Sequence, residues 1–131
     1  MRVLVMYSWD DDISEMRWHR NTSDPELAHF EIAQCFALPS EGAAVHGPSV
    51  ARRLATAIED FQPDVVLIHT GAAFRRSPSA FVECVQLVKA KYANLRLGYE
   101  RRSRGFPAFE ELNAFETSPE IADIERRFFG G

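Results

Sequence analysis

The sequence predicts one α/β domain, residues 1–131, with a central, mostly parallel sheet of four to five strands flanked by helices. The first observation is Val65-Val66-Leu67-Ile68, an apolar run with three β-branched residues, bounded by Pro63 and Gly71. Such a run is typical of a strand buried on both faces. The second observation is that a helical pattern over 77–92 and an apolar segment over 95–99 follow it. A strand, a helix and a strand in succession predict a βαβ unit, whose strands are parallel.

Residues 2–7 form the first predicted strand, which is apolar after Arg2 and therefore central. Ser8-Trp9-Asp10-Asp11-Asp12 follows it. Three adjacent aspartates could bind a divalent cation or cap a helix, and the plainer interpretation is a solvated acidic loop with one N-cap.

Residues 24–38 give mixed signals. Ser23-Asp24-Pro25-Glu26 has the pattern of a helix start, whereas residues 30–38 alternate between apolar and polar as a strand does. We therefore expect a helical turn near 25–28 and a strand over about 30–38, with helix left open for the whole segment.

The loop over 39–48 lacks the spaced glycines and the lysine of a phosphate-binding P-loop. Ser49 is predicted to cap the next helix, and Arg52 and Arg53 are placed on the solvated side of that helix. Its apolar stripe is Val50, Leu54, Ile58 and Phe61.

In the segment 77–92, Ser77 is the predicted N-cap and Pro78 the first helical residue. Helical geometry points Glu83 away from the apolar stripe. The stripe consists of Phe81, Cys84, Val85, Val88 and Tyr92.

The C-terminal third contains a second hydroxyl–proline–acid start at Ser118-Pro119-Glu120, and the helix that follows should stop at Gly130. Its predicted buried face carries Ile121, Ile124 and Phe128. Residues 106–117 could be strand or helix, with 112–115 either a fifth strand or the end of a short helix.

The net charge of −4 argues against a general nucleic-acid-binding protein. No apolar run is long enough to cross a bilayer, and the chain opens directly into a strand without a signal peptide, so we expect a cytoplasmic protein. Cys35 and Cys84 have no metal-ligand spacing and are expected to be buried thiols rather than a disulfide. The four histidines also lack ligand spacing, so no metal site is predicted.

Three loops should meet at the carboxyl edge of the sheet, where ligands of open α/β sheets bind: residues 8–12, 69–77 and 100–105. They bring Arg75, Arg76 and Arg101 near the carboxylate of Glu83. Guanidinium groups pair with phosphates and a carboxylate stabilises an oxocarbenium ion, which suits a sugar nucleotide. The alternative is that all of these charges are solvated surface groups.

Tyr7-Ser8-Trp9-Asp10-Asp11, closing the first strand, resembles the opening of Toll/interleukin receptor (TIR) domains. The glycine-bearing loop 42–47, the strand 64–70 and the interval from Ser77 to Glu83 follow in the family's order. The resemblance covers most of residues 1–99. The sequence departs from the family at Ser79-Ala80, where a Trp-Cys pair is usual, and at His69-Thr70, where a serine is usual.

The resemblance implies a flavodoxin-like three-layer sandwich and, for some bacterial members, cleavage of NAD⁺ at the nicotinamide ribosyl bond in antiphage signalling. Glu83 would then be catalytic, Ser77 would match the family's serine near the substrate, and NAD⁺ would be a substrate rather than a bound cofactor. Ser8, Trp9 and Asp10 would line the pocket. Charge placement adds Arg75, Arg76 and Arg101 as contacts to the pyrophosphate. Self-association or a partner protein is also expected.

Two classes of function remain open: an NAD⁺-consuming enzyme and a non-catalytic TIR-like or flavodoxin-like interaction module. A phosphoacceptor receiver domain is disfavoured because His69 stands where it needs an aspartate. A nucleoside deoxyribosyltransferase is disfavoured because the expected acidic and glycine pattern is absent. A cleft shared by Glu83 and Trp9 would favour the enzyme, whereas a solvent-exposed Glu83 without a cavity would favour the module.

Overall fold

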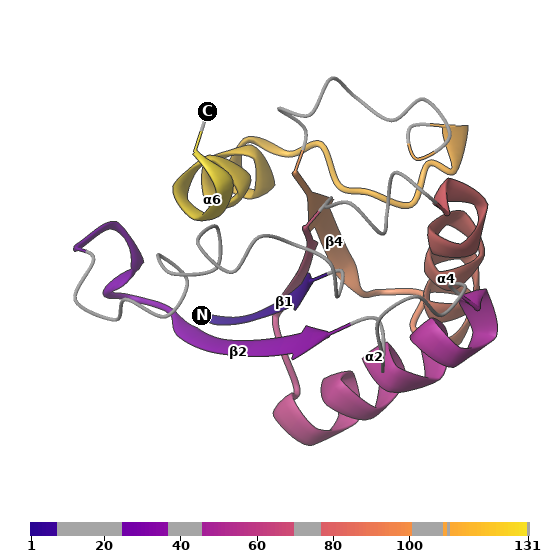
Figure 1. The fold of residues 1–131 in the computed structure, drawn as a ribbon. Coiled ribbons are helices and arrows are strands. Elements are labelled where there is room, and N and C mark those ends of the chain that lie inside the picture. The colour runs from indigo at the N-terminus through magenta and orange to yellow at the C-terminus, as the bar shows by residue number, and fades with distance from the viewer. Residues whose placement is uncertain (8–24, 37–45, 70–76, 101–108, 110, 131) are drawn as a thin grey trace.

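The computed structural model describes residues 1–7, 25–36, 46–69, 77–100, 109 and 111–130 (Figure 1). Its described strands form one four-stranded sheet in the order β2-β1-β3-β4, and all three pairings are parallel. This arrangement confirms the predicted α/β class and is consistent with a flavodoxin-like sandwich. The strands are β1 (Arg2–Tyr7), β2 (Glu31–Phe36), β3 (Val65–Ile68) and β4 (Arg96–Tyr99).

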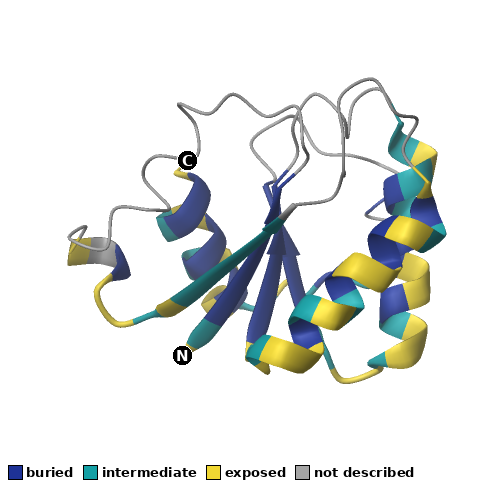
Figure 2. Ribbon diagram, turned by 60° about the horizontal axis from the view of Figure 1, so that its bottom comes forward, coloured by how far each residue is buried: buried dark blue, intermediate teal, exposed yellow. Residues whose placement is uncertain are grey.

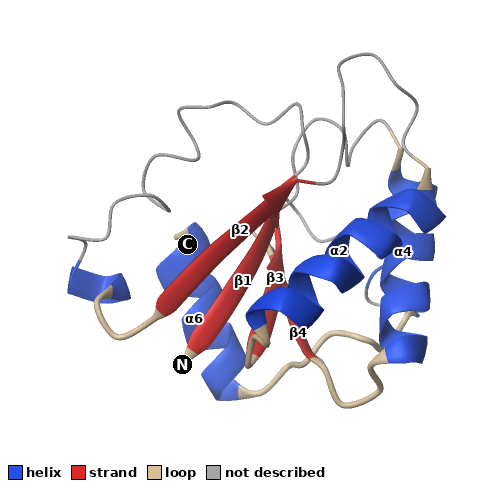
Figure 3. Ribbon diagram, turned by 90° about the horizontal axis from the view of Figure 1, so that it is seen from below, coloured by secondary structure: helices blue, strands red, loops and turns tan. Residues whose placement is uncertain are grey.

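The helices lie on both faces of this sheet and make three layers (Figure 3). Helices α2 (Gly47–Phe61) and α4 (Pro78–Lys91) pack on one face. Helix α6 (Pro119–Phe129) and the short 3₁₀ turn η2 (Pro25–Leu27) contact the other. No helix of the described residues is long and apolar enough to cross a membrane.

The two central strands are buried on both faces, which explains their uninterrupted apolar sequences (Figure 2). In β1, Leu4 and Met6 pack toward α2 and α4, while Val3 and Val5 pack toward α6. In β3, the side chains alternate in the same way, and all four residues are fully buried. Each such side chain contributes roughly 1.5–3 kcal/mol by leaving water, so the two strands hold the layers together.

The segment that the sequence left ambiguous contains both predicted elements: η2 comes first and β2 follows. The described strand covers Glu31–Phe36, and residues 37 and 38 of the predicted span lie outside the described residues. In the C-terminal third, residues 112–115 form turns rather than a fifth strand. They follow the helical residues Phe109 and Glu111, and the Leu112 amide donates to the Phe109 carbonyl, so the helix-end alternative describes them better than a strand does.

Two of the three predicted N-cap serines, Ser77 and Ser118, occupy the N-cap position, and one of them makes the capping hydrogen bond. The Ser118 hydroxyl accepts from the Ile121 amide at 3.2 Å, as predicted for an N-cap. Ser77 occupies the N-cap position of α4, but its hydroxyl makes no capping hydrogen bond, and its carbonyl accepts from the Ala80 amide instead. Ser49 is not a cap at all, because α2 begins earlier, at Gly47.

The outer edge of β4 is covered by the chain that follows it. The Tyr99 amide donates to the buried Glu125 carboxylate of α6 at 2.9 Å, and the Leu97 carbonyl accepts from the Glu116 amide at 2.9 Å. Gly98 lies between these contacts. A Cβ at Gly98 would stand 2.9 Å from Glu125 Oε2, so the glycine lets α6 approach the strand.

Gly98→Ala is expected to destabilise the protein by roughly 1–3 kcal/mol, the usual cost of overpacking a close-packed site. The added methyl would also stand 2.8 Å from Leu67 Cδ2, so two neighbours would have to move. Urea unfolding followed by circular dichroism measures the change. An unchanged midpoint would show that α6 does not need to lie this close to β4.

An ion-pair network fixes the start of β4 to the segment before α6. The Arg96 guanidinium donates to both carboxylate oxygens of Glu116, at 2.9 and 2.6 Å, and to Glu120 Oε1 at 2.6 Å. Glu116 also accepts from the Ser118 hydroxyl. The Arg96 guanidinium, helped by that hydroxyl, lowers the pKa of the Glu116 carboxyl to about 2.

Because the pKa of Glu116 is lower in the folded than in the unfolded chain, its contribution to stability is present above its ordinary pKa and is lost as the pH falls toward about 2. Arg96→Gln should therefore lower the urea midpoint at neutral pH, and the difference from wild type should shrink in acid. Arg52→Gln is the matched control, since that guanidinium donates to the Ser49 hydroxyl rather than to a carboxylate. A difference that stays constant from neutral to acid pH would contradict this account.

Candidate functional site

The carboxyl ends of three neighbouring strands lie level with one another. Met6 of β1 pairs with Ile68 of β3, which pairs with Tyr99 of β4. The chain order places β1 and β3 side by side although β2 comes between them in sequence. The strand order therefore reverses at β1 and β3, and α/β sheets bind ligands at the carboxyl side of such a switch point.

A buried acid–base pair stands at this edge. His69, directly after β3, places its Nε2 3.1 Å from Oε2 of Glu100, directly after β4; the side chains are 3% and 6% exposed. Their amides continue the ladder, since His69 N donates to the Met6 carbonyl and Glu100 N to the Ile68 carbonyl. The Tyr7 ring lies 5.2 Å from the imidazole, centroid to centroid. The pair ties the ends of β3 and β4 together.

Sequence reasoning placed His69 and Glu100 in two converging loops but did not pair them. The sequence did contain a signal from which the pairing of His69 with Glu100 could have been predicted. Each residue is the first after an apolar strand, and the two strands are consecutive in a βαβ unit. Consecutive parallel strands of such a unit are often neighbours, so the residues just beyond their ends stand side by side.

Glu100→Ala is expected to destabilise the protein by roughly 1–3 kcal/mol, because it removes the carboxylate that lies 3.1 Å from the imidazole of buried His69 and leaves that polar ring without this partner. Glu100→Gln should cost less, since an amide still offers both a donor and an acceptor. Glu111→Ala, at an exposed glutamate, serves as the control and should change stability by less than about 0.5 kcal/mol. Equal midpoints for Glu100→Ala and its control in urea unfolding would contradict a structural role for the pair.

Glu83 lies in the second turn of α4 and is exposed, as its helical position predicts. It packs against the first residue of α2, Gly47. A Cβ on Gly47 would stand 2.9 Å from the Glu83 Cβ and 3.0 Å from its carboxyl carbon. The carboxylate is therefore held beside the N-terminus of α2.

The two cysteines are free thiols, as the sequence predicts. Burial raises the pKa of Cys84 to about 12 and also that of Cys35 to about 12. Since the thiolate is the nucleophilic form, neither residue is suited to act as a nucleophile at neutral pH.

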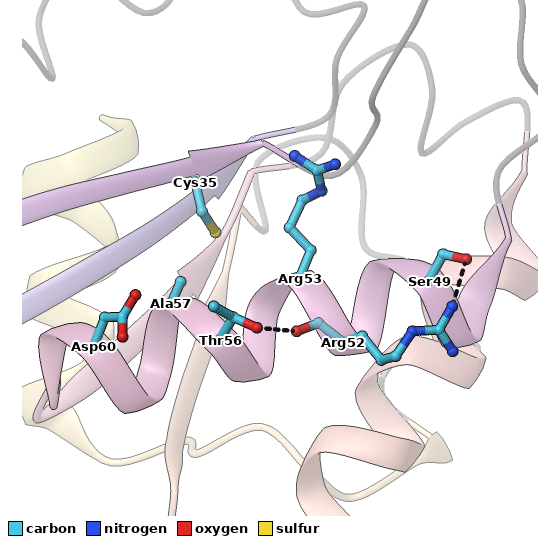
Figure 4. A pocket seen from close by; sticks show the side chains of 7 residues that line it. All are labelled: Cys35, Ser49, Arg52, Arg53, Thr56, Ala57 and Asp60. Atoms are coloured by element: carbon cyan, nitrogen blue, oxygen red, sulfur yellow. Dashed lines mark hydrogen bonds between the residues drawn. The ribbon is translucent and has the colours of Figure 1, made fainter.

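A groove of about 570 Å³ lies between α2 and the edge strand β2 (Figure 4). It does not include Glu83. Arg53 points toward the carboxyl end of β2 and Asp60 stands near the other end of the groove, with Thr56 and Ala57 between them. The remaining lining residues are Cys35, Ser49 and Arg52.

Of the predicted site residues, the structure describes two, Glu83 and Ser77. Ser77 is half-buried and is the N-cap residue of α4, whereas Glu83 lies in the second turn of that helix. The predicted substrate contacts Ser8, Trp9, Asp10, Arg75, Arg76 and Arg101 lie outside the described residues. Within the described part of the chain, no three His, Cys, Asp or Glu side chains gather as metal ligands would.

Comparison of the chain with protein-family models, with curated proteins and with solved structures finds no match in any of the three. The likeness to TIR domains therefore consists of the short motifs in the sequence. What the structure adds is the all-parallel sheet and the position of Glu83.

Proposed function

We propose that this chain is a TIR-like domain that cleaves NAD⁺ at the nicotinamide ribosyl bond, with Glu83 as the carboxylate that acts on the ribose. The observation that carries the proposal is the contact of Glu83 with Gly47. It sets an exposed carboxylate between the second turn of α4 and the first turn of α2. Both helices begin at the carboxyl edge of the sheet, because each follows the end of a parallel strand.

This position suits both halves of a dinucleotide. The amide groups in the first turn of a helix carry partial positive charge and attract phosphate. A carboxylate beside them can stabilise the positive charge that develops on ribose as the bond to nicotinamide breaks. Arg75, Arg76 and Arg101 belong to segments that follow β3 and β4, and we assign them to the pyrophosphate.

In the reaction, the bond between the ribose carbon and the nicotinamide nitrogen breaks, and nicotinamide leaves with the bonding electrons. Water or a nucleophile of the substrate itself then attacks the ribose carbon, giving ADP-ribose or a cyclised form. By the family resemblance, we place this reaction in cytoplasmic antiphage signalling by a self-associating protein.

A second candidate is a non-catalytic interaction module. The observation that favours it is that Glu83 is exposed and does not line the groove between α2 and β2, which is the arrangement expected of a module. Trp9, the other residue of that criterion, lies outside the described residues. In this case the surfaces of α2 and α4 would bind a partner protein, and no bond would be broken.

Incubation of concentrated protein with NAD⁺, followed by chromatography of nicotinamide, tests the proposal. Wild type should release nicotinamide. Glu83→Gln should reduce the rate by roughly two orders of magnitude or more, because the neutral amide no longer stabilises developing positive charge. Glu111→Gln removes an exposed carboxylate elsewhere and should keep the wild-type rate.

No release by concentrated wild-type protein would favour the interaction module. Release that Glu83→Gln leaves unchanged would place the chemistry on another residue. Since Glu83 is exposed, the variant is expected to fold normally, and circular dichroism with a thermal melt verifies this.

A further inference from the structure

The two outer strands of the described sheet, β4 and β2, differ in the hydrogen bonds made on their outer sides. The outer side of β4 is bonded by the Glu116 amide and the Glu125 carboxylate. Strand β2 pairs with β1 alone, and no hydrogen bond from the described residues reaches its other side. Residues 32–35 of β2 are only partly buried, in contrast to the fully buried residues of β1 and β3. An outer strand whose backbone groups have no partner among the described residues on one side is a template for pairing with another chain.

The groove beside β2 has opposite charges at its two ends. Arg53 and Asp60 are both exposed and lie seven residues apart on α2, on the same side of the helix and about 10 Å apart along its axis. Thr56 and Ala57, with small side chains, lie at the midpoint (Figure 4). The order along the groove is therefore positive, small, negative.

Two grooves with this order of charges are complementary when they face each other in antiparallel orientation. A two-fold axis through the Thr56–Ala57 midpoint would set α2 antiparallel to the α2 of a second copy. Arg53 of each copy would then face Asp60 of the other, and the small side chains at the centre would let the helices approach. The same axis would bring the two β2 strands together in antiparallel orientation, with their outer backbone groups facing each other.

We propose that the β2 edge and the α2 groove form a homodimer interface with a second copy of this chain. The two β2 strands pair across a two-fold axis, and Arg53 of each protomer contacts Asp60 of its partner. The charge pattern suits an antiparallel second copy, because both ends of the groove then meet an opposite charge, whereas a partner of a single charge would meet one favourable and one unfavourable end. The proposal does not depend on cleavage of NAD⁺.

Sedimentation velocity over a range of protein concentrations tests this interface. Wild type should dimerise, more strongly at low salt. Arg53→Glu and Asp60→Arg should each raise the dimer dissociation constant by roughly tenfold or more, because two attractive pairs become repulsive at once. The double variant carrying both reversals should regain the wild-type constant.

A mixture of the two single variants gives a sharper result. Arg53→Glu and Asp60→Arg protomers should form a heterodimer with each other, since both pairs across the axis are then opposite in charge. Glu111→Lys is the control for a charge reversal elsewhere and should dimerise like wild type. All three altered residues are exposed, so the thermal melts should match.

Wild-type protein that stays monomeric at every concentration would overturn the proposal, and the groove would then be open to a small anion or an acidic partner. A dimer that neither reversal weakens would also overturn it, because association would then use a different surface.

Discussion

The fold depends on one constraint, which is that β1 and β3 are apolar on both faces and must be covered on both. Val3, Val5, Leu67 and their neighbours are inaccessible to water. Helices α2 and α4 cover one face, and α6 with η2 covers the other. Parallel pairing follows, because each crossover connection must carry the chain back to the opposite end of the sheet. The carboxyl ends of the strands then meet at one edge, and α2 and α4 both begin there.

The parts of the fold that the sequence predicted well are those set by burial. The limits of the strand Val65–Ile68 coincide with the apolar run, since burial on both faces leaves no polar position to blur them. The caps were predicted less well. Ser77, Ser49 and Ser118 all stand beside helical prolines or helix starts, yet only Ser118 makes the capping bond. A capping hydrogen bond depends on the backbone dihedral angles at the start of the helix, and the residue types alone do not predict those angles.

In the candidate site, too, some features could be predicted from the sequence and others could not. The exposure of Glu83 follows from helical periodicity alone. Its neighbour across the helix interface, Gly47, was not predictable, because the contact is set by how α2 and α4 cross rather than by either helix alone. The His69–Glu100 pair is intermediate: the sequence placed both residues at one edge, and only the strand order made them partners.

The close contact of Gly98 with Glu125 limits the number of copies that the proposed sheet pairing can join. Their contact covers the outer side of β4, so in the proposed dimer β2 is the outer strand that pairs with a second copy. A protomer with one sheet edge that can pair forms a closed dimer, whereas a protomer with two such edges can form an open filament. In the proposed dimer, the Glu125 carboxylate would occupy the Tyr99 amide and so keep β4 from pairing with a third copy. Without that carboxylate, the Tyr99 amide would be open to pairing, and growth of the assembly would no longer be limited to two copies.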